Sequence, residues 1–378
     1  MAARRRRRTV SSLDAPYREV LRRIERNIKF LLSDPLGIIL NPRRAKLPIP
    51  LSDIKSILIL RYDALGDVVL STPLWRTLKK HAPGIRIGVA GSTRNELLLK
   101  SDPDIDDVFV VSRAVSTSVV KELLRARKQK WDIVLNLFFH DKTRAAVFAK
   151  IMSPDGISVT IVREKKEKYE RLYSFVGDRP PLPTPMVLQN LKVLLDAVEI
   201  QISEEEKLPS LKLDSDFDLA FSESLRTLIH PKKKYVLINI DASQSNKEWG
   251  LENSFLFSKQ ITENTDMQVL WTCGPQSQSA VEQFLNAKRP HSILLPSTPS
   301  ILHLAVAVRH AAAVVTPDTS VVHFATAQQI PVVGLYLEAN EFLPFGGPSR
   351  VVFTPDGKTM GRIPVAEVYN ALLSFISQ

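Results

Sequence analysis

The sequence predicts an α/β protein with two Rossmann-like, doubly wound parallel-sheet domains that face each other across a cleft. Two observations lead to this prediction. From residue 55 onward, short runs of Val, Ile and Leu alternate with helical patterns, and apolar runs without polar alternation are typical of parallel strands buried on both faces. The alternation lapses in the middle of the chain and starts again at Tyr235, which indicates two separate doubly wound units.

The first series contains four pairs of a strand and a helix. The predicted strands are SILILRY (56–62), IRIGVA (85–90), DVFVV (107–111) and DIVLNLF (132–138), and the predicted helices cover 67–81, 94–100, 116–128 and 142–151. The segment GDRPPLPTP (177–185) is too rich in proline for a helix or a central strand, because proline lacks the N–H that both require. A helix over 187–198 follows, and the charged stretch after it, which ends at HPKKK, is predicted to be a loop.

The second series begins at Tyr235. Its predicted strands are YVLINI (235–240), MQVLWTC (267–273), SILLP (292–296), AVVT (313–316) and PVVGLY (331–336), and its helices cover 252–264, 277–287, 300–311, 319–328 and, in the tail, 364–376. We therefore expect a basic arm over 1–50, an N-terminal domain over 51–205, a linker over 206–231 and a C-terminal domain over 232–363, with a terminal helix (364–378) that could pack back on the N-terminal domain. Ligands of such folds bind at the carboxyl ends of the strands.

The basic character of the chain is concentrated in the N-terminal arm. The chain has 378 residues and a formal net charge of +11, and residues 1–50 alone hold 13 Lys and Arg against 4 acidic residues. Within the arm, YREVLRRIERNIKFLL (17–32) has the pattern of a basic amphipathic helix, which is typical of binding to an anionic membrane surface. We expect residues 1–46 to bind such a surface; docking on the protein's own body is the alternative. Nucleic-acid binding is not expected, because no recognition fold accompanies the arginines.

Other features of the composition narrow the class of protein. A single cysteine, Cys273, excludes an internal disulfide and suits a reducing compartment. The sequence contains no run of 18 apolar residues, so a membrane-spanning helix is not expected. The Asp-x-Asp segments DPDIDD (102–107) and DSDFD (214–218) are interpreted as solvated loops, and no His or Cys cluster has zinc spacing. The sequence thus predicts no metal site and no cofactor.

Three loops at the carboxyl ends of predicted strands carry unusual polar residues. The first runs from Asp63 to Asp67 and contains Gly66, which allows a sharp turn and a close approach to a ligand. The second is DASQSNKEW (241–249), and the third is TPDTSVVHFATA (316–327). A helix is predicted to begin within the third loop, and the free N–H groups at a helix start bind anions such as a diphosphate.

Each of these residues also has an ordinary structural interpretation. Asp67 could be the N-cap of the helix over 67–81, and Asp318 could be the N-cap of the helix that follows it. His323 and Trp249 could be packed in the core, and Lys247 could be a surface lysine. A functional interpretation therefore depends on the whole set of motifs.

Taken together and in order, the motifs resemble those of the bacterial heptosyltransferases, glycosyltransferase family 9. The segment ILILRYDALGDVVLSTPLW (57–75) resembles the family signature of a strand, a loop that ends in Gly-Asp and a helix with a Thr-Pro pair. The later matches are Lys247 and Trp249, then Asp318, Thr319 and His323, then Ala325 and Ala327 followed by PVVGLY. The resemblance extends from residue 55 to residue 345, and the arm lies outside it.

The resemblance implies the GT-B fold, with the acceptor on the N-terminal domain and the nucleotide sugar on the C-terminal domain. It implies inverting, metal-independent transfer of a heptose from ADP-heptose to a lipopolysaccharide core or another lipid-linked acceptor. Such an enzyme would be cytoplasmic and peripherally associated with the inner face of the inner membrane.

The resemblance also implies roles for single residues. Asp67 would be the base that takes the proton of the acceptor hydroxyl, since an ionised carboxylate within hydrogen-bond reach suffices. The residues implied for the donor are Ser243, Lys247, Gln276, Asp318, Thr319, Ser320 and His323. The residues expected on the acceptor side are Asp63, Gly66, Lys142, Arg144 and Arg163, of which the basic ones would meet phosphates or carboxylates of the acceptor.

The chain departs from the family pattern at the donor side. Ser320 stands where Gly is common, and Gln276 stands where an acidic residue often meets the donor ribose. The loop after the last predicted strand is also unusual and reads LEANEFLPFGG (337–347). Two alternatives stay open: a nucleotide-sugar epimerase-like enzyme on the same fold, and a non-catalytic membrane-associated binding protein with a degenerate donor site.

Overall fold

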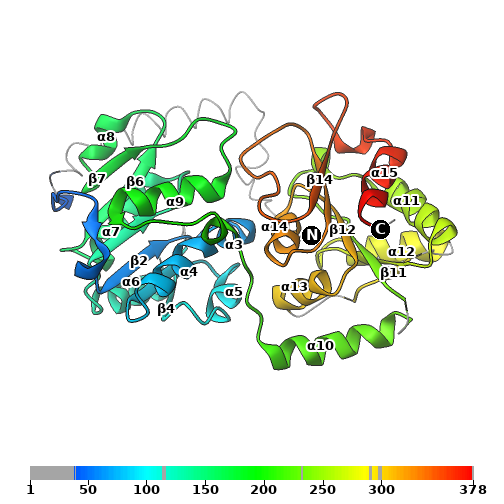
Figure 1. Cartoon of the computed structure of the whole chain (residues 1–378), viewed down its shortest axis with the longest axis horizontal. Coiled ribbons are helices and arrows are strands. Elements are labelled where there is room, and N and C mark those ends of the chain that lie inside the picture. The colour runs from blue at the N-terminus through cyan, green and yellow to red at the C-terminus, as the bar shows by residue number, and fades with distance from the viewer. Residues whose placement is uncertain are drawn as a thin grey trace, which may run out of the picture.

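The computed structural model describes residues 38, 40–112, 116–230, 233–288, 292–296 and 300–376. These residues form two lobes side by side, one from each half of the chain, and each lobe is built on a six-stranded parallel sheet packed between helices (Figure 1). This arrangement confirms the predicted α/β class with two doubly wound parallel sheets. The predicted membrane-binding arm lies outside the described residues except for residues 38 and 40–46.

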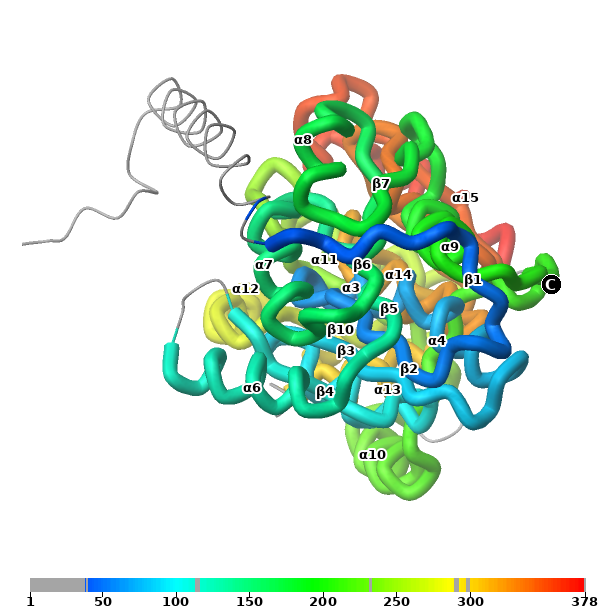
Figure 2. The backbone as a smooth tube through the Cα atoms, turned by 90° about the vertical axis from the view of Figure 1, so that its left-hand side faces the viewer, coloured from blue at the N-terminus to red at the C-terminus, as the bar shows by residue number. Residues whose placement is uncertain are grey.

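The N-terminal sheet consists of β2 (Ser56–Leu60), β3 (Arg86–Gly91), β4 (Asp107–Val110), β5 (Ile133–Asn136), β6 (Ile157–Val162) and β7 (Phe175–Asp178). Its order is β4-β3-β2-β5-β6-β7, and Figure 2 shows β4 near the bottom of this lobe and β7 near its top. Its helices are α3 (Leu65–Val69), α4 (Thr72–His81), α5 (Glu96–Lys100), α6 (Thr117–Arg127), α7 (Lys142–Met152), α8 (Lys166–Glu170) and α9 (Met186–Ala197). A separate two-stranded sheet pairs β1 (Ile49–Pro50) with β8 (Val198–Glu199), and two short 3-10 helices are η2 (Leu51–Asp53) and η3 (Glu205–Lys207).

The C-terminal sheet consists of β9 (Tyr235–Asn239), β10 (Gln268–Thr272), β11 (Ile293–Leu294), β12 (Ala313–Pro317), β13 (Val332–Tyr336) and β14 (Ser349–Phe353), in the order β11-β10-β9-β12-β13-β14. Its helices are α10 (Ser215–Leu228), α11 (Leu251–Asn264), α12 (Gln278–Lys288), α13 (Ile301–Arg309), α14 (Ser320–Ala327) and α15 (Val365–Ile376), with the 3-10 helices η4 (Ser245–Lys247) and η5 (Met360–Arg362).

Both sheets reverse their strand order at a central pair. In the N-terminal sheet the reversal falls between β2 and β5, and in the C-terminal sheet it falls between β9 and β12. Ligands of open α/β sheets bind at the carboxyl ends of the strands where the order reverses. The three polar loops that the sequence singles out follow β2, β9 and β12, so all of them lie at such reversal points.

Several predicted boundaries are wrong, and each error has a local cause. The helix predicted over 67–81 is two helices, α3 and α4, because Pro73 inside one continuous helix would clash with the carbonyl of residue 69. The strands β6 and β7, on either side of the short helix α8, lie in a stretch where the sequence predicted no element. The segment predicted as a linker contains α10, and β14 was not predicted.

The C-terminal helix packs on its own lobe and not on the N-terminal domain. Val368 and Leu372 of α15 are fully buried in the apolar cluster of the C-terminal lobe, together with Phe257 of α11 and Val352 of β14. The suggestion that the terminal helix packs back on the N-terminal domain is therefore wrong. The amphipathic pattern showed that one face is buried but could not show which lobe buries it.

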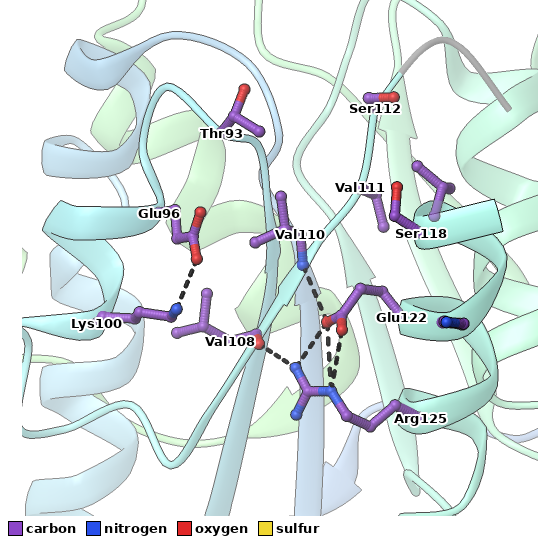
Figure 3. A pocket seen from close by; sticks show the side chains of 12 residues that line it. Thr93, Glu96, Lys100, Val108, Val110, Val111, Ser112, Ser118, Glu122 and Arg125 are labelled. Atoms are coloured by element: carbon purple, nitrogen blue, oxygen red, sulfur yellow. Dashed lines mark hydrogen bonds and ion pairs between the residues drawn. The ribbon is translucent and has the colours of Figure 1, made fainter. Parts of the chain in front are cut away.

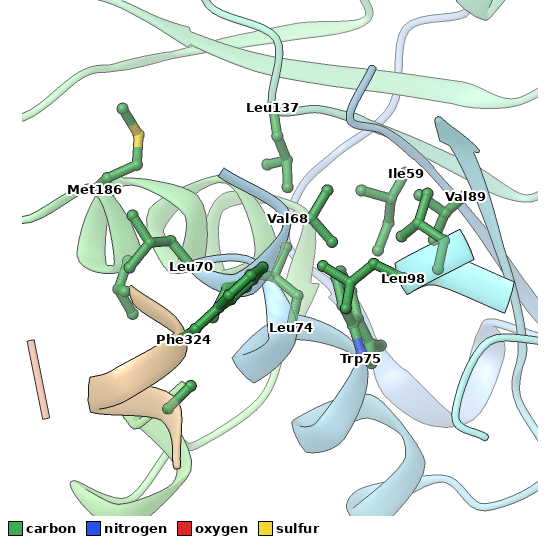
Figure 4. Close-up of a cluster of buried hydrophobic side chains, with 14 of the residues drawn as sticks. Ile59, Val68, Leu70, Leu74, Trp75, Val89, Leu98, Leu137, Met186 and Phe324 are labelled. Atoms are coloured by element: carbon green, nitrogen blue, oxygen red, sulfur yellow. The ribbon is translucent and has the colours of Figure 1, made fainter. Parts of the chain in front are cut away.

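An apolar cluster joins the two lobes beside the reversal points. Figure 4 shows Phe324 of α14, from the C-terminal lobe, beside Leu70, the C-cap of α3, and Leu74 of α4. All three side chains are buried. This contact sets α14 against α3, so the carboxyl end of β2 faces the carboxyl ends of β9 and β12.

Among the described residues, no helix is long and apolar enough to span a membrane.

Candidate functional site

The loop after β2 is organised around a buried arginine. Arg61 is 1% exposed, and its Nη1 donates a hydrogen bond to Asp63 Oδ2 at 2.7 Å and forms an ion pair with Asp67 Oδ1 at 3.7 Å. Its other nitrogens bond Ser71 Oγ at 2.9 Å and Asn190 Oδ1 of α9 at 2.6 Å. The arginine is held from three sides, so it fixes both carboxylates of the loop.

Asp67 does not cap a helix. The N-cap of α3 is Ala64 and that of α4 is Ser71, whereas Asp67 is the third residue of α3. The interpretation of Asp67 as an N-cap is therefore wrong, and its carboxylate is paired with Arg61.

Asp63 behaves differently from Asp67. Burial raises the pKa of Asp63 from 3.8 to about 7, the Arg61 charge opposes this rise, and the Asp67 charge adds to it. Its Oδ1 has no hydrogen-bond partner among the described residues. Asp63 does not line the cavity described below, whereas Asp67 does.

Gly66 allows the two lobes to meet closely. A Cβ atom added at Gly66 would lie 2.7 Å from Cδ2 of His323 and 3.4 Å from Cα of Ser320, both on α14. His323 is 3% exposed, and burial lowers its pKa to about 4, so the ring is neutral at pH 7. The glycine thus serves close packing of α3 on α14 as well as access to a ligand.

The C-terminal wall brings together two of the polar loops. Lys247 Nζ, in the loop after β9, forms an ion pair with Asp318 Oδ2, after β12, at 2.7 Å. Thr319 is the N-cap of α14, since its Oγ1 accepts from the N–H of Val321 at 3.3 Å. Asp318 is therefore not the cap, and Lys247 is not an ordinary surface lysine.

A cavity of about 400 Å³ lies between the lobes. It is lined by Ala64, Leu65, Gly66, Asp67 and Arg94 from the N-terminal lobe and by Ser243, Lys247, Asp318, Thr319, Ser320, His323 and Phe342 from the C-terminal lobe. Eight of these were predicted as site residues from the sequence. Arg94, in the loop after β3, and Phe342, in the loop after β13, were missed, because Arg94 was assigned to the helix predicted over 94–100 and no local pattern marks Phe342 as a site residue.

The remaining predicted residues lie elsewhere. Gln276 is exposed and does not line the cavity. Lys142 donates to the carbonyl of Phe139 at 2.8 Å, and Arg144 pairs with Asp141 at 3.5 Å. Arg163 pairs with Glu341 of the opposite lobe at 2.8 Å.

A second and larger cavity contains none of the predicted site residues. It measures about 470 Å³ and lies at the edge strand β4, between α5 and α6 (Figure 3). Here Glu122 accepts from the N–H of Val110 at 3.3 Å, and Arg125 donates to the carbonyl of Val108. These side chains occupy the free edge of the sheet and so protect it from pairing with another strand.

The Asp-x-Asp segments have structural partners. Asp102 is 7% exposed and accepts from Trp75 Nε1 at 3.0 Å and from Arg76, and Asp214 caps α10 through the N–H of Phe217 at 2.9 Å. The interpretation as solvated loops therefore fails for the buried Asp102 and for residues 215–218, which form the first turn of α10, whereas Asp106, Asp214 and Asp216 are exposed as expected. No group of three or more His, Cys, Asp or Glu that could hold a metal ion occurs within the part of the chain that the structure describes.

Comparison with known proteins agrees with this geometry. The sequence profile of glycosyltransferase family 9 (heptosyltransferase) matches residues 118–345. Lipopolysaccharide heptosyltransferase 3 of Escherichia coli strain K12 is 25% identical over 289 residues, which cover 72% of this chain and 79% of that protein.

Two solved structures share the fold. A family 9 glycosyl transferase from Veillonella parvula superposes with a TM-score of 0.73 at 18% identity, over 85% of this chain and 97% of that one. The heptosyltransferase WaaC of E. coli, solved with ADP, superposes with a TM-score of 0.66 at 16% identity, over 85% of this chain and 99% of that one.

Proposed function

Since the chain belongs to glycosyltransferase family 9, we propose that it moves a heptose from ADP-heptose to a lipopolysaccharide core acceptor, with inversion and without a metal. The observation that carries this proposal is the cavity between the lobes, which has the Asp67 carboxylate on one wall and Lys247, Asp318 and the start of α14 on the other. A base and a set of partners for a leaving diphosphate therefore face the same space.

The donor would lie against the C-terminal wall. A diphosphate develops negative charge as the bond to the sugar breaks, and preorganised N–H groups and cations stabilise that charge. The N–H of Ser320 at the start of α14, the hydroxyl of Ser243 and the ammonium of Lys247 would supply such partners. Asp318 holds Lys247 in place through their ion pair. The ADP bound to the E. coli relative supports adenosine diphosphate as the leaving group.

The base would act from the N-terminal wall. Asp67 would accept the proton of the acceptor hydroxyl while that oxygen forms its bond to the anomeric carbon. The bond from this carbon to the diphosphate breaks on the opposite face, and its electron pair leaves with the diphosphate. Arg61 fixes the position of the carboxylate, and an aligned carboxylate base contributes about 10²- to 10⁴-fold to the rate.

The acceptor would extend toward the basic side chains beyond Asp67. Lys142, Arg163 and His140 lie on this side. Burial lowers the pKa of His140, although the negative charge of Asp67 acts to raise it. Arg144 lies two residues after Lys142 in α7. We also propose that the enzyme works at the cytoplasmic face of the inner membrane, attached through the basic N-terminal arm.

A panel of nucleotides tests the donor assignment. ADP, UDP, GDP and CMP are compared for their effect on the melting temperature, since the nucleotide that binds the folded state stabilises it by RT ln(1 + [L]/Kd). ADP should give the largest shift. Stabilisation by UDP in place of ADP would reject the ADP-sugar. Consumption of ADP-heptose without an acceptor would favour the epimerase-like alternative, and absence of any turnover with an acceptor would favour the binding protein.

A further inference from the structure

An ion cluster ties the two lobes together next to the cavity. Glu341, in the loop after β13, receives Arg163 Nη2 on its Oε2 at 2.8 Å and Arg179 Nη2 on its Oε1 at 3.0 Å. Gln189 of α9 donates to Glu341 Oε2 at 3.1 Å. One carboxylate of the C-terminal lobe therefore bridges two arginines of the N-terminal lobe.

The N-terminal side of this cluster carries more positive charge than Glu341 neutralises. Burial and, to a smaller extent, the charges of Arg179 and Arg163 together lower the pKa of Lys142 to about 8. Arg179 also stacks on the Phe139 ring, with its guanidinium carbon 4.4 Å from the ring centroid. Three cations thus lie close enough to repel one another and share one carboxylate from the opposite lobe, so the cluster favours a ligand with more negative charge.

The cluster is continuous with the candidate catalytic site on both sides. On the N-terminal side, His140 lies within electrostatic reach of both Asp67 and Arg179. On the C-terminal side, Phe342 follows Glu341 directly and lines the cavity. Glu341 holds the loop after β13 against the N-terminal lobe through its backbone as well as its side chain, because the backbone carbonyl of Glu341 accepts from the N–H of Met186 at 2.8 Å.

We propose that Arg163, Arg179 and Lys142 form a binding subsite for a phosphate monoester carried by the acceptor, and that Glu341 occupies this subsite as an internal competitor. The proposal rests on the proposed function only for the identity of the molecule that carries the phosphate. Guanidinium groups bind carboxylate and phosphate through the same hydrogen-bond geometry, and a phosphate offers one more oxygen and a second negative charge.

Displacement of Glu341 would release the loop over 337–347. Phe342 would then be free to move, so occupation of the subsite would change the wall of the cavity in which the donor lies. An acceptor without the phosphate would leave the cross-lobe contact closed. The subsite therefore couples recognition of a phosphorylated acceptor to the shape of the donor cavity, and such couplings typically amount to about 5- to 150-fold in affinity.

Calorimetry with the full-length protein tests the competition. Inorganic phosphate is titrated into the wild type, Glu341→Gln and the control Glu338→Gln, which lies in the same loop but is exposed. ADP is present throughout so that phosphate does not fill a diphosphate site. Glu341→Gln should bind phosphate about fivefold or more tightly than the wild type, and Glu338→Gln should match the wild type. An unchanged or weaker affinity in Glu341→Gln would overturn the proposal.

Two further measurements identify the subsite and its ligand. Arg163→Gln added to Glu341→Gln should abolish the gain in affinity, and a gain that persists would overturn the assignment to this cluster. Mannose 6-phosphate should bind like inorganic phosphate, whereas binding of the free ion alone would overturn the acceptor assignment. Phosphate should also raise amide hydrogen exchange over residues 337–347 in the wild type; unchanged exchange would overturn the release of the loop. None of these results depends on heptose transfer, so failure of the proposed function is detected separately.

Discussion

Replacing Gly66 with alanine tests whether close packing between the lobes positions the catalytic loop. The added Cβ would lie 2.7 Å from Cδ2 of His323, about 1 Å inside the 3.5–4.0 Å of an ordinary carbon contact. His323 cannot turn away freely, because it is 3% exposed and its neighbour Phe324 is fully buried. The strain must therefore be relieved by moving α3 away from α14.

The expected cost follows from this geometry. Overpacking of a well-packed contact destabilises a protein by about 1–3 kcal/mol, and each kcal/mol lowers the melting temperature by about 2–4 °C in a domain of 150–250 residues. Asp67 follows Gly66 on the same helix, and misplacing a catalytic group by about 1 Å can reduce the rate by about 10²-fold. Gly66→Ala should therefore lose both stability and kcat.

The assay compares the melting temperature and kcat of Gly66→Ala with those of Gly84→Ala. A Cβ at Gly84 would meet nothing within 4 Å, so this control should behave like the wild type in both measurements. If Gly66→Ala is as stable and as active as the control, α3 and α14 are not packed as described, and the reasoning fails.

Three further predictions follow from the same contacts. Burial raises the pKa of Asp63 to about 7 in the folded protein, whereas it is about 3.9 in the unfolded chain. The folded state therefore binds an extra proton, and the wild type loses stability as the pH rises from 4 to 7 and Asp63 ionises. The melting temperature of Asp63→Asn minus that of the wild type should grow over this pH range, and a constant difference would contradict the shift. Lys247→Ala removes the cation beside the donor diphosphate and should raise the Kd of ADP by about tenfold or more, whereas Lys259→Ala on the exposed side of α11 should leave it unchanged; equal affinities would remove Lys247 from the donor site. Deletion of residues 1–37 should leave a folded enzyme that no longer sediments with anionic liposomes. The deletion spares the contacts of Arg44 with the backbone carbonyls of Glu170 and Tyr173. Undiminished sedimentation would exclude the arm as the membrane contact.

The fold was predictable where the sequence repeats one simple pattern. The strands β2 and β9 each contain four consecutive apolar or aromatic residues and are followed by a turn with polar residues, so their type and their order were clear. The stretch from β6 to β7 was missed because its short apolar run ISVTIV is followed by a charged segment and then by prolines, which together resemble a linker. The helix α10 was missed because the acidic residues of its first turn were interpreted as part of a solvated loop. Asp214 instead caps the helix.

The candidate site was predictable where its residues follow strands directly. Asp67, Lys247 and Asp318 were found because each lies in a polar loop at the carboxyl end of a strand, and parallel sheets gather such loops at one edge. Arg94, Phe342 and Glu341 were not found, because no local pattern marks them as site residues; Glu341 is placed by its contacts with Arg163 and Arg179 of the opposite lobe. Gln276 was assigned by its position in the family pattern, and the side chain is exposed outside the cavity.

The central claim is that Asp67 is the base. Asn keeps the size and most of the hydrogen bonds of Asp but cannot take up the acceptor proton. The most direct measurement is the kcat of Asp67→Asn with ADP-heptose and acceptor, with the Kd of ADP measured on the same preparation. We predict that kcat falls by about 10²-fold or more while the Kd of ADP stays near that of the wild type. A kcat near that of the wild type would contradict the assignment.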